Sequence, residues 1–480
     1  MKQLTKLLLI CLPLVLSLYS CKKEWLDAKP NKSLAVPHTL RDYKSLISST
    51  IASPGFNTNY ATLPEHGSGD FFFTTAAWGS VPETDRAFYL WKKELWIEKN
   101  YAAWEGPYSK ILYTNVVLEG IEKIVPVSNA EQIDWNQTKG AALFLRAVWH
   151  YEIAKQFCKV YNKTTASGDP GIPLRLNADF NEVSTRSTVE ATYSQIIYDL
   201  KAAAILLPVE RPDNLINKCQ PTKTAAYAML ARVYLAMSDY VNALEYADKS
   251  LLLYNVTLNY NDSVTTRTNM KTFQVALNPA PTSTLQPFAN FNDDMIFHMR
   301  GSFFPIFGNS TLSVDTNLYK SYNANDLRKR AFFRLKPDGT ASFKGSYEPI
   351  GSITFWTGLS TAEVYLIRAE CRARKGDLGL AMADLNFLMR RRWKTGTWID
   401  ASATDMNDAL SKILTERRKE LVFRSIRWTD LRRLNKEPQF AVTLTREIPG
   451  HYELPANSPL YVFPIPPNVI QLTGMPQNPR

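Results

Sequence analysis

Aromatic residues crowd into one short stretch, where they could stack against a ring-shaped ligand. Gly69-Asp70-Phe71-Phe72-Phe73 is followed at once by Ala77-Trp78-Gly79. A tryptophan between small residues can present a flat apolar face to the C–H groups of a sugar, and a neighbouring carboxylate can accept hydrogen bonds from its hydroxyls. We therefore take Asp70, Phe73 and Trp78 as candidate ligand-binding residues. The alternative is that these aromatics only dock the loop onto its scaffold, which we favour for Phe71 and Phe72.

Further aromatic residues offer additional candidates, since the chain contains 23 Tyr, 23 Phe and 11 Trp. Trp91, Trp96 and Trp104 stand in helix-like surroundings and are predicted to belong to the core. The aromatics of a later stretch are expected to divide between core and surface. They are Phe288, Phe291, Phe303, Phe304, Phe307, Tyr319 and Tyr322.

The motifs of common enzyme classes are missing from the sequence. It contains no G-x-S-x-G, no H-E-x-x-H, no phosphate-binding glycine loop and no dinucleotide fingerprint. Asp293-Asp294 is an acidic pair, and a glycosidase needs two carboxylates, but paired aspartates in loops commonly serve turns and caps. We therefore expect a protein without catalytic residues, cofactor or metal.

The N-terminal residues have the pattern of a lipoprotein signal. Lys2 and Lys6 precede an apolar stretch that is too short to cross a bilayer, and Leu18-Tyr19-Ser20-Cys21 resembles a lipobox. The pattern predicts a signal peptide over residues 1–20 and lipidation of Cys21, through which acyl chains would anchor the protein. The alternative is an ordinary signal peptide with a cysteine nearby by chance. No later segment has a long uncharged apolar run, so the anchor is the only membrane contact we predict.

Charge and cysteine content exclude several classes of protein. The formal net charge of +11 is modest for 480 residues and does not indicate nucleic-acid binding. Arginine clusters at 390–392, 417–418 and 432–433 are interpreted as solvated helix faces or internal ion pairs, in preference to a phosphate-binding patch. Beyond Cys11 and Cys21, the remaining cysteines form no C-x-x-C pair and are expected to be free thiols in the core: Cys158, Cys219 and Cys371.

Helical hairpins recur along the chain. Residues 222–251 combine Ala231 and Ala243, twelve positions apart, with a break at Ser238-Asp239, which is the pattern of a tetratricopeptide repeat. Residues 361–392 repeat the scheme with Ala369 and Ala381. More degenerate helical units are predicted at about 102–124 and 139–161, and a final helix at about 408–434.

The segments between these units are irregular in composition. Residues 52–90 and 255–356 are rich in Asn, Thr, Ser, Gly, Pro and Phe, and only pieces such as 295–299 suggest short strands. Long ordered loops of this kind are usually functional. We expect a mainly α-helical fold over residues 21–480, in one domain, with loop-rich excursions and a few short strands.

Several motifs resemble the SusD/RagB family, and the match runs nearly end to end. The most specific is Glu416-Arg417-Arg418-Lys419-Glu420-Leu421, continuing to Arg427-Trp428-Thr429-Asp430-Leu431-Arg432-Arg433. It resembles the family's E-R-R-x-E-L and R-[FW]-x-D-L-x-R helix. Other pieces with the family's order and spacing are the Leu26-Asp27 pair after Cys21, Trp104 with Tyr108, Ile111 and Asn115, Leu145-Arg146-Ala147 with Tyr151, Ala369-Glu370, Phe463-Pro464-Ile465-Pro466, and Gln477-Asn478-Pro479.

This resemblance implies both a fold and a role. The fold would be a right-handed superhelical scaffold of four tetratricopeptide-like units with an irregular region above them. The role would be that of an outer-membrane lipoprotein that captures glycans, or in some members peptides, for a SusC-like TonB-dependent transporter. Glycans would lie on a shallow aromatic surface of the irregular face. One departure stands out, because the family usually has Glu-Gly where Arg424-Ser425 stands here, which puts local ion pairing in doubt.

Two other interpretations of the sequence remain open beside the SusD/RagB resemblance. A tetratricopeptide scaffold that binds only protein would show a concave helical groove lined with exposed polar residues. An enzyme would need two acids that converge within about 5–9.5 Å in a pocket.

Overall fold

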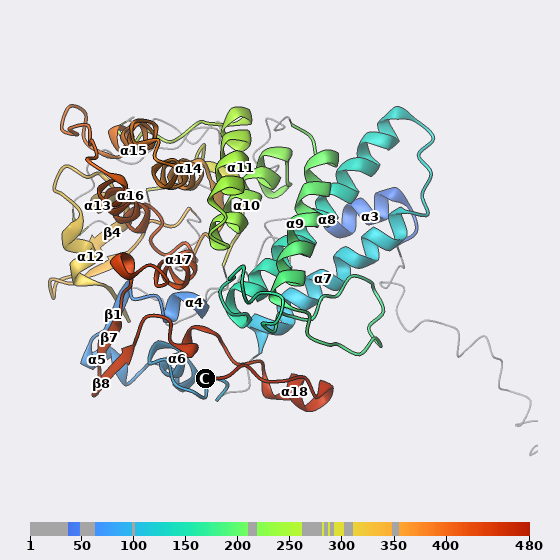
Figure 1. The fold of residues 1–480 in the computed structure, drawn as a ribbon, viewed down its shortest axis with the longest axis horizontal. Helices are drawn as coiled ribbons and strands as arrows, with labels where there is room; N and C mark the ends of the chain where they lie inside the picture. The colour runs from blue at the N-terminus through green and yellow to red at the C-terminus, as the bar shows by residue number, and fades with distance from the viewer. Residues whose placement is uncertain are drawn as a thin grey trace, which may run out of the picture.

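Helices packed side by side form most of the molecule, as Figure 1 shows. The structure is a computed structural model that describes residues 37–48, 63–97, 101–209, 218–261, 281–282, 287–288, 292–301, 311–347 and 355–480. The fold is mainly α-helical and tetratricopeptide-like, as predicted. The main array consists of α7 (Ala102–Ile121), α8 (Asn129–Phe157), α9 (Val189–Leu206), α10 (Lys223–Ala236), α11 (Tyr240–Leu253), α14 (Thr361–Lys375), α15 (Leu378–Arg392) and α16 (Met406–Glu420).

Two hairpins of this array have the predicted small-residue contacts. Ala231 of α10 and Ala243 of α11 are fully buried, as are Ala369 of α14 and Ala381 of α15. Side chains of this size let two antiparallel helices approach closely. The α14–α15 turn ends at Gly376, whose φ of 95° lies in the left-handed region that favours glycine.

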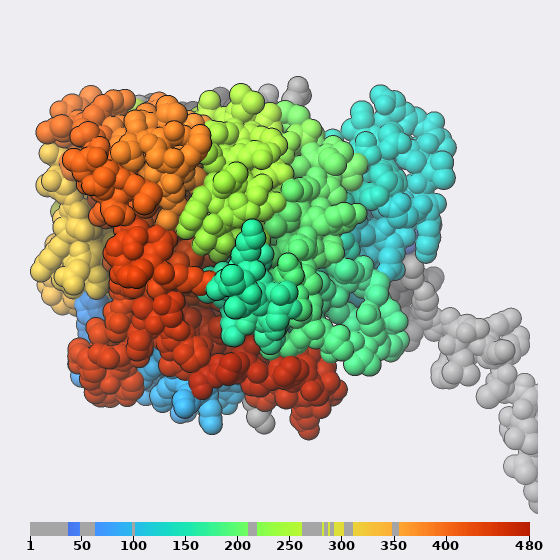
Figure 2. Space-filling model, viewed as in Figure 1, coloured from blue at the N-terminus to red at the C-terminus, as the bar shows by residue number. Residues whose placement is uncertain are grey.

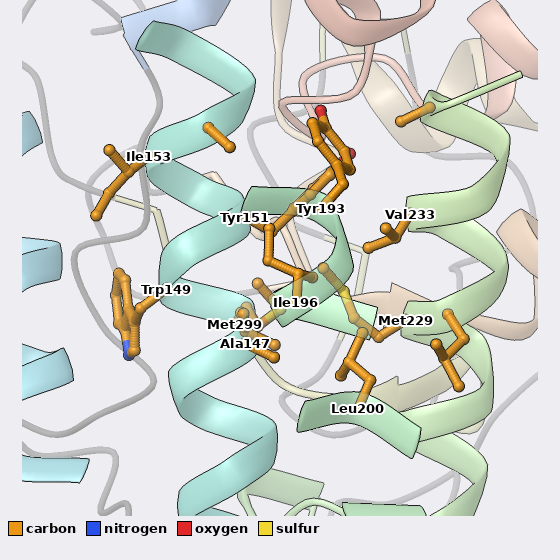
Figure 3. Close-up of a cluster of buried hydrophobic side chains, with 14 of the residues drawn as sticks. Ala147, Trp149, Tyr151, Ile153, Tyr193, Ile196, Leu200, Met229, Val233 and Met299 are labelled. Carbon is orange, nitrogen blue, oxygen red and sulfur yellow. The ribbon is translucent and has the colours of Figure 1, made fainter. Parts of the chain in front are cut away.

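The core of the array lies between α8, α9 and α10. Figure 3 shows Tyr151 of α8 beside Tyr193 and Ile196 of α9, facing Val233 of α10, whereas Trp149 points to the other side of α8. α8 is buried almost without interruption from residue 140 to residue 157. This half of the helix therefore meets neighbours all round and has no single apolar stripe.

Two helical features differ from the sequence prediction. α8 begins at Asn129, ten residues before the predicted start. Its first turns are polar and exposed, so they lack the apolar pattern on which the prediction depended. Ser128 caps them, because its side chain accepts a hydrogen bond from the backbone of Glu131. α9 was not predicted at all, although it packs against both α8 and α10.

The predicted final helix is two helices. α16 ends at Glu420, α17 spans Arg427–Leu434, and the chain turns between them. Phe423 and Ser425 have φ values of 56° and 57°, which a continuous helix cannot contain. The apolar stripe continues across the break, so the sequence pattern alone could not reveal it.

The irregular regions contain short two-stranded sheets and short helices. The antiparallel pairs are β1 (Phe71–Phe73) with β3 (Leu312–Val314), β2 (Met295–Phe297) with β6 (Leu359–Ser360), β4 (Phe333–Leu335) with β5 (Ala341–Phe343), and β7 (Leu444–Glu447) with β8 (His451–Leu454). β2 confirms the strand predicted near residues 295–299. A second hydrophobic core lies among these elements and includes Phe71, Phe333 and Phe423.

The remaining helices are short and pack around the array and the sheets. They are α3 (Leu40–Ile47), α4 (Leu63–His66), α5 (Thr75–Trp78), α6 (Glu83–Tyr89), α12 (Thr316–Ser321), α13 (Arg328–Phe332) and α18 (Pro467–Thr473), with 3-10 turns at Pro438–Phe440 and Pro459–Tyr461. Figure 1 places α5, α6, β7 and β8 together at the end of the molecule opposite α3.

Candidate ligand-binding site

Trp78 lies at the end of α5, a single helical turn with no buried residue. The turn is held by Thr74, whose side-chain oxygen accepts a hydrogen bond from the backbone nitrogen of Ala77 at 3.3 Å. Trp78 and the preceding residue Ala77 are half-buried, and the following residue Gly79 is exposed. Part of the indole ring is therefore open to solvent.

The buried part of the Trp78 ring rests on two aromatic rings. Its centroid is 5.9 Å from that of Phe73 and 5.8 Å from that of Tyr89. The guanidinium carbon of Arg86 lies 5.6 Å from the same ring. These contacts fix the orientation of the indole, so that its accessible part is a preformed apolar surface with a cation beside it.

Asp70, in contrast, is completely buried and is used within the fold. One of its oxygens, Oδ1, accepts a hydrogen bond from Nε of Arg418 at 2.9 Å, and its backbone oxygen accepts one from the backbone nitrogen of Asp315. Its other oxygen, Oδ2, has no hydrogen-bond partner within the described part of the chain. The carboxylate joins the first irregular stretch to α16 and does not face solvent in this structure.

Phe73 is also buried, with 3% of its surface exposed, and serves as a support for Trp78. The alternation of β1 explains this, because successive strand side chains point to opposite faces. Phe71 and Phe73 point into the second core, while Phe72 is only half-buried. Of the three candidates named from the sequence, Trp78 alone is in contact with solvent.

The second irregular stretch has fewer exposed aromatics than expected among the residues described. Phe288 and Tyr322 are buried, and Tyr319 is half-buried with Nζ of Lys329 4.9 Å from its ring. The remaining candidates lie outside the described residues: Phe291, Phe303, Phe304 and Phe307. Trp91, Trp96 and Trp104 are core residues, as predicted.

The acidic pair Asp293-Asp294 has a structural role. Asp294 is fully buried and its carboxylate accepts hydrogen bonds from Tyr347, Arg392 and the backbone of Leu258. Burial, and to a smaller extent the nearby charge of Asp70, raises the pKa of Glu65 to about 8. Glu65 is itself inaccessible. Over the described ranges, no cluster of His, Cys, Asp and Glu has the composition of a metal site.

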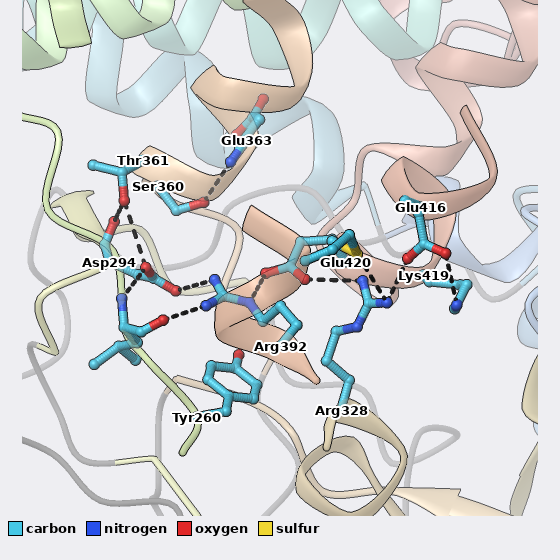
Figure 4. Close-up of polar contacts among 12 residues, drawn as sticks. Tyr260, Asp294, Arg328, Ser360, Thr361, Glu363, Arg392, Glu416, Lys419 and Glu420 are labelled. Carbon is cyan, nitrogen blue, oxygen red and sulfur yellow. Dashed lines mark hydrogen bonds and ion pairs between the residues drawn. The ribbon is translucent and has the colours of Figure 1, made fainter. Parts of the chain in front are cut away.

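Four arginines of these clusters, Arg392, Arg417, Arg418 and Arg433, form ion pairs with buried carboxylates. Figure 4 shows a buried chain in which Arg392 lies between Asp294 and Glu420, and Arg328 continues it to Glu416. Arg392 NH2 is 2.9 Å from Asp294 Oδ2, and its Nε is 2.8 Å from Glu420 Oε1. The signature residues of α16 therefore fasten this helix to α15 and to the irregular region, and do not form a phosphate-binding patch.

The unusual Arg424-Ser425 pair is accommodated by two aromatic rings and a backbone hydrogen bond. The guanidinium carbon of Arg424 lies 3.7 Å from the centroid of the Tyr347 ring and 4.6 Å from that of Trp356. The backbone nitrogen of Ser425 donates a hydrogen bond to Oε1 of Glu65 at 2.5 Å. Its positive φ explains why glycine suits this position.

A groove that the sequence analysis did not identify lies between α7, α18 and the chain after α8. Its volume is about 420 Å³, and its walls include Trp104, Tyr108, Phe180 and Leu472. Phe180 is 80% exposed, so this groove is a second place where an aromatic ring meets solvent. An isolated phenylalanine in a polar loop gives little signal in a sequence, because its exposure depends on the path of the loop.

The predicted signal and Cys21 lie outside the described residues. Within the described part of the chain, no helix has both the length and the apolar character needed to span a membrane. Cys158, Cys219 and Cys371 are buried, as predicted.

Comparisons with known proteins agree with this architecture. A family model named SusD-like and described as "Starch-binding associating with outer membrane" matches residues 24–235, and a model of the SusD family matches residues 344–480. No curated protein matches the chain.

Solved structures with the same fold cover nearly the whole chain. A putative sugar-binding protein from Bacteroides vulgatus has a TM-score of 0.69 at 19% identity, over 93% of this chain and 99% of its own. A SusD superfamily protein from Bacteroides thetaiotaomicron also has a TM-score of 0.69, at 21% identity, over 92% and 98%. Surface glycan-binding protein A from Bacteroides uniformis has a TM-score of 0.66 at 15% identity, over 92% and 98%.

Proposed function

Because the chain belongs to the SusD/RagB family, we propose that it is a non-catalytic surface lipoprotein that captures glycans. It would deliver them to a SusC-like TonB-dependent transporter of the outer membrane, to which Cys21 would tether it. The observation that carries this proposal is the half-exposed ring of Trp78, fixed in place by Phe73 and Tyr89. A rigid aromatic face suits the apolar side of a sugar ring and costs little conformational entropy on binding.

The polar part of the site would come from neighbours of Trp78 on its own helix, just after that helix, and on α6. Thr75 and Ser80 are exposed and offer hydroxyl groups, and Arg86 lies against the ring. These groups can donate hydrogen bonds to sugar oxygens. Asp70 and Phe73 act behind this surface, the first by holding Arg418 and the second by supporting the indole.

A peptide ligand is the alternative within the same family role. A deep or charged cleft would favour a peptide, whereas Trp78 lies on a helical turn that has no buried residue. The groove beside Phe180 is the competing location for either ligand.

A binding screen tests both the ligand class and the site. The chain from Lys22 onward would be assayed against a panel of glycans and peptides, alongside Trp78→Ala and Phe180→Ala. Glycan binding that is lost in Trp78→Ala would support the proposal, and loss in Phe180→Ala alone would move the site to the groove. Peptide binding without any glycan response at millimolar concentrations would contradict glycan capture.

The anchor has its own test. Mass spectrometry of the protein made in a bacterium with lipoprotein processing should find acyl chains on Cys21, and Cys21→Ser should release the protein from the membrane fraction. An unmodified Cys21 in the mature protein would contradict the lipoprotein assignment.

A further inference from the structure

A cavity of about 320 Å³ lies where the end of α8, the end of α17 and residues 457–462 meet. In Figure 2, the segment that follows α8 borders the C-terminal segment on the face in view. The cavity falls in the size range of small-molecule sites. It does not involve α5 or Trp78, so what it binds is independent of the proposed glycan surface.

The floor of the cavity consists of three buried polar side chains. Arg432, Asn435 and Tyr461 expose only 6%, 3% and 4% of their surfaces, and all three line the cavity. Among the described residues, Nε of Arg432 has no hydrogen-bond partner, and Nδ2 of Asn435 and the hydroxyl of Tyr461 have none besides each other. Buried donors are rarely left unpaired, because each loses its bonds to water.

The other atoms of Arg432 explain its position but do not neutralise its charge. NH1 and NH2 donate hydrogen bonds to the backbone oxygens of Lys155 and Cys158, at the end of α8. The partial negative charge of a helix C-terminus favours a cation there. Among the described residues, no carboxylate forms an ion pair with Arg432, whereas Arg433 beside it pairs with Glu370 at 2.6 Å.

The rim adds positive charge. Lys436 is exposed, and its Nζ donates a hydrogen bond to the backbone oxygen of Tyr161 at 2.9 Å. Lys159 lies on the same rim, but Asp169 neutralises it at 2.6 Å. Burial lowers the pKa of both Arg432 and Lys436, and for Lys436 the charge of Arg432 lowers it further. The described residues that line the cavity therefore include three cations, Lys159, Arg432 and Lys436, and one carboxylate, Asp169, which pairs with Lys159 and also attracts Lys436.

We propose that this cavity binds a small oxyanion, a carboxylate or phosphate group, carried on a molecule about the size of one sugar ring. The oxyanion would accept hydrogen bonds from Nε of Arg432 and Nδ2 of Asn435, and Lys436 would add charge from the rim. The hydroxyl of Tyr461 and the exposed Asn162 and Thr165 would face the rest of the ligand. A mixed set of charged and amide donors of this kind favours oxyanions over neutral sugars.

The test is a calorimetric titration of the full chain in detergent with glucuronate, with inorganic phosphate and with glucose. Arg432→Met would remove the caps of α8 and could unfold the protein, so the informative variants are Lys436→Gln and Tyr461→Phe. Lys412→Gln, which changes a half-buried lysine on α16 that pairs with Asp408, serves as the control.

At least one of the two anions should bind saturably, with an affinity that falls as salt is added. Lys436→Gln should weaken binding about tenfold, Tyr461→Phe about fivefold, and Lys412→Gln should have no effect. Glucuronate binding alone would identify a carboxylate ligand, and phosphate binding alone a phosphate ligand. Glucose binding as tight as that of the anions, or no saturable binding of either anion, would overturn the proposal. The cavity would then hold only water at the end of α8.

Discussion

Arg392 and Trp78 lie in two regions whose side chains are held in opposite ways. Arg392 is fully buried at the end of α15, between the carboxylates of Asp294 and Glu420. Trp78 sits on one turn of helix with no buried residue, and two aromatic rings support it from behind. The first region gives the scaffold its connections, and the second offers a surface.

This difference predicts that the two regions fail in different ways. Removing one member of a buried ion-pair network leaves charges without partners and destabilises the fold. Removing a half-exposed ring leaves the fold nearly intact but deletes a contact surface. Stability and ligand binding should therefore respond to separate sets of substitutions.

The largest expected effect is on the ion-pair network. Arg392→Met should lower the free energy of unfolding by about 3–5 kcal/mol, because Asp294 and Glu420 lose a buried cation. Chemical denaturation followed by circular dichroism would measure this. Arg390→Met is the matched control on the same helix, since its pair with Asp400 is exposed and should contribute less than about 1 kcal/mol. Equal losses in both variants would contradict the account.

The next effect depends on pH and on the contact between Glu65 and Ser425. In the folded protein the pKa of Glu65 is raised from 4.5 to about 8, so the folded state holds a proton that the unfolded state releases between these values. The free energy of unfolding should therefore fall as pH rises from 5 to 8, by at most about 1.4 kcal/mol per pH unit from this group.

Glu65→Gln should flatten that dependence, because an amide does not titrate but can still accept the hydrogen bond from Ser425. Thermal unfolding of both proteins at pH 5 and pH 8 would measure how strongly the stability of each depends on pH. A slope that stays unchanged in Glu65→Gln would show that another group causes it.

The smallest effect concerns the turn between α16 and α17. Ser425→Gly should raise the free energy of unfolding by up to about 1 kcal/mol, because glycine adopts a φ of 57° without steric cost. Gly376→Ala is the control with the opposite expected sign. Gly376 has a φ of 95° and open space around it, so the alanine should lower the free energy of unfolding by about 1 kcal/mol through backbone strain alone. A loss of stability in Ser425→Gly would mean that the serine side chain contributes more than the backbone strain costs.

The sequence predicted the hairpins well because their signals are local. Ala231 and Ala243 are small residues at a fixed spacing around a break, and both lie buried where the two helices meet. α9 was not predicted, although it packs against α8 and α10. The break after Glu420 was not predicted, and one contact of that turn, the hydrogen bond from Ser425 to Glu65, joins residues 360 positions apart.

The candidate site was predicted only in part, for a similar reason. The placement of Trp78 between small residues pointed to an exposed ring. The burial of Asp70 depends on Arg418, nearly 350 positions away, and that of Phe73 on the pairing of β1 with β3. Contacts of this range are set by the tertiary fold and leave no pattern in the local sequence.

The most direct test is the affinity of Trp78→Ala for the glycan that the binding screen identifies. We predict a loss of at least about tenfold. The melting temperature should stay within about 2 °C of the unchanged protein. Tyr198→Ala, which removes a 66% exposed aromatic ring from α9, should bind as the unchanged protein does. Full affinity in Trp78→Ala, or an equal loss in Tyr198→Ala, would contradict the assignment of the binding surface.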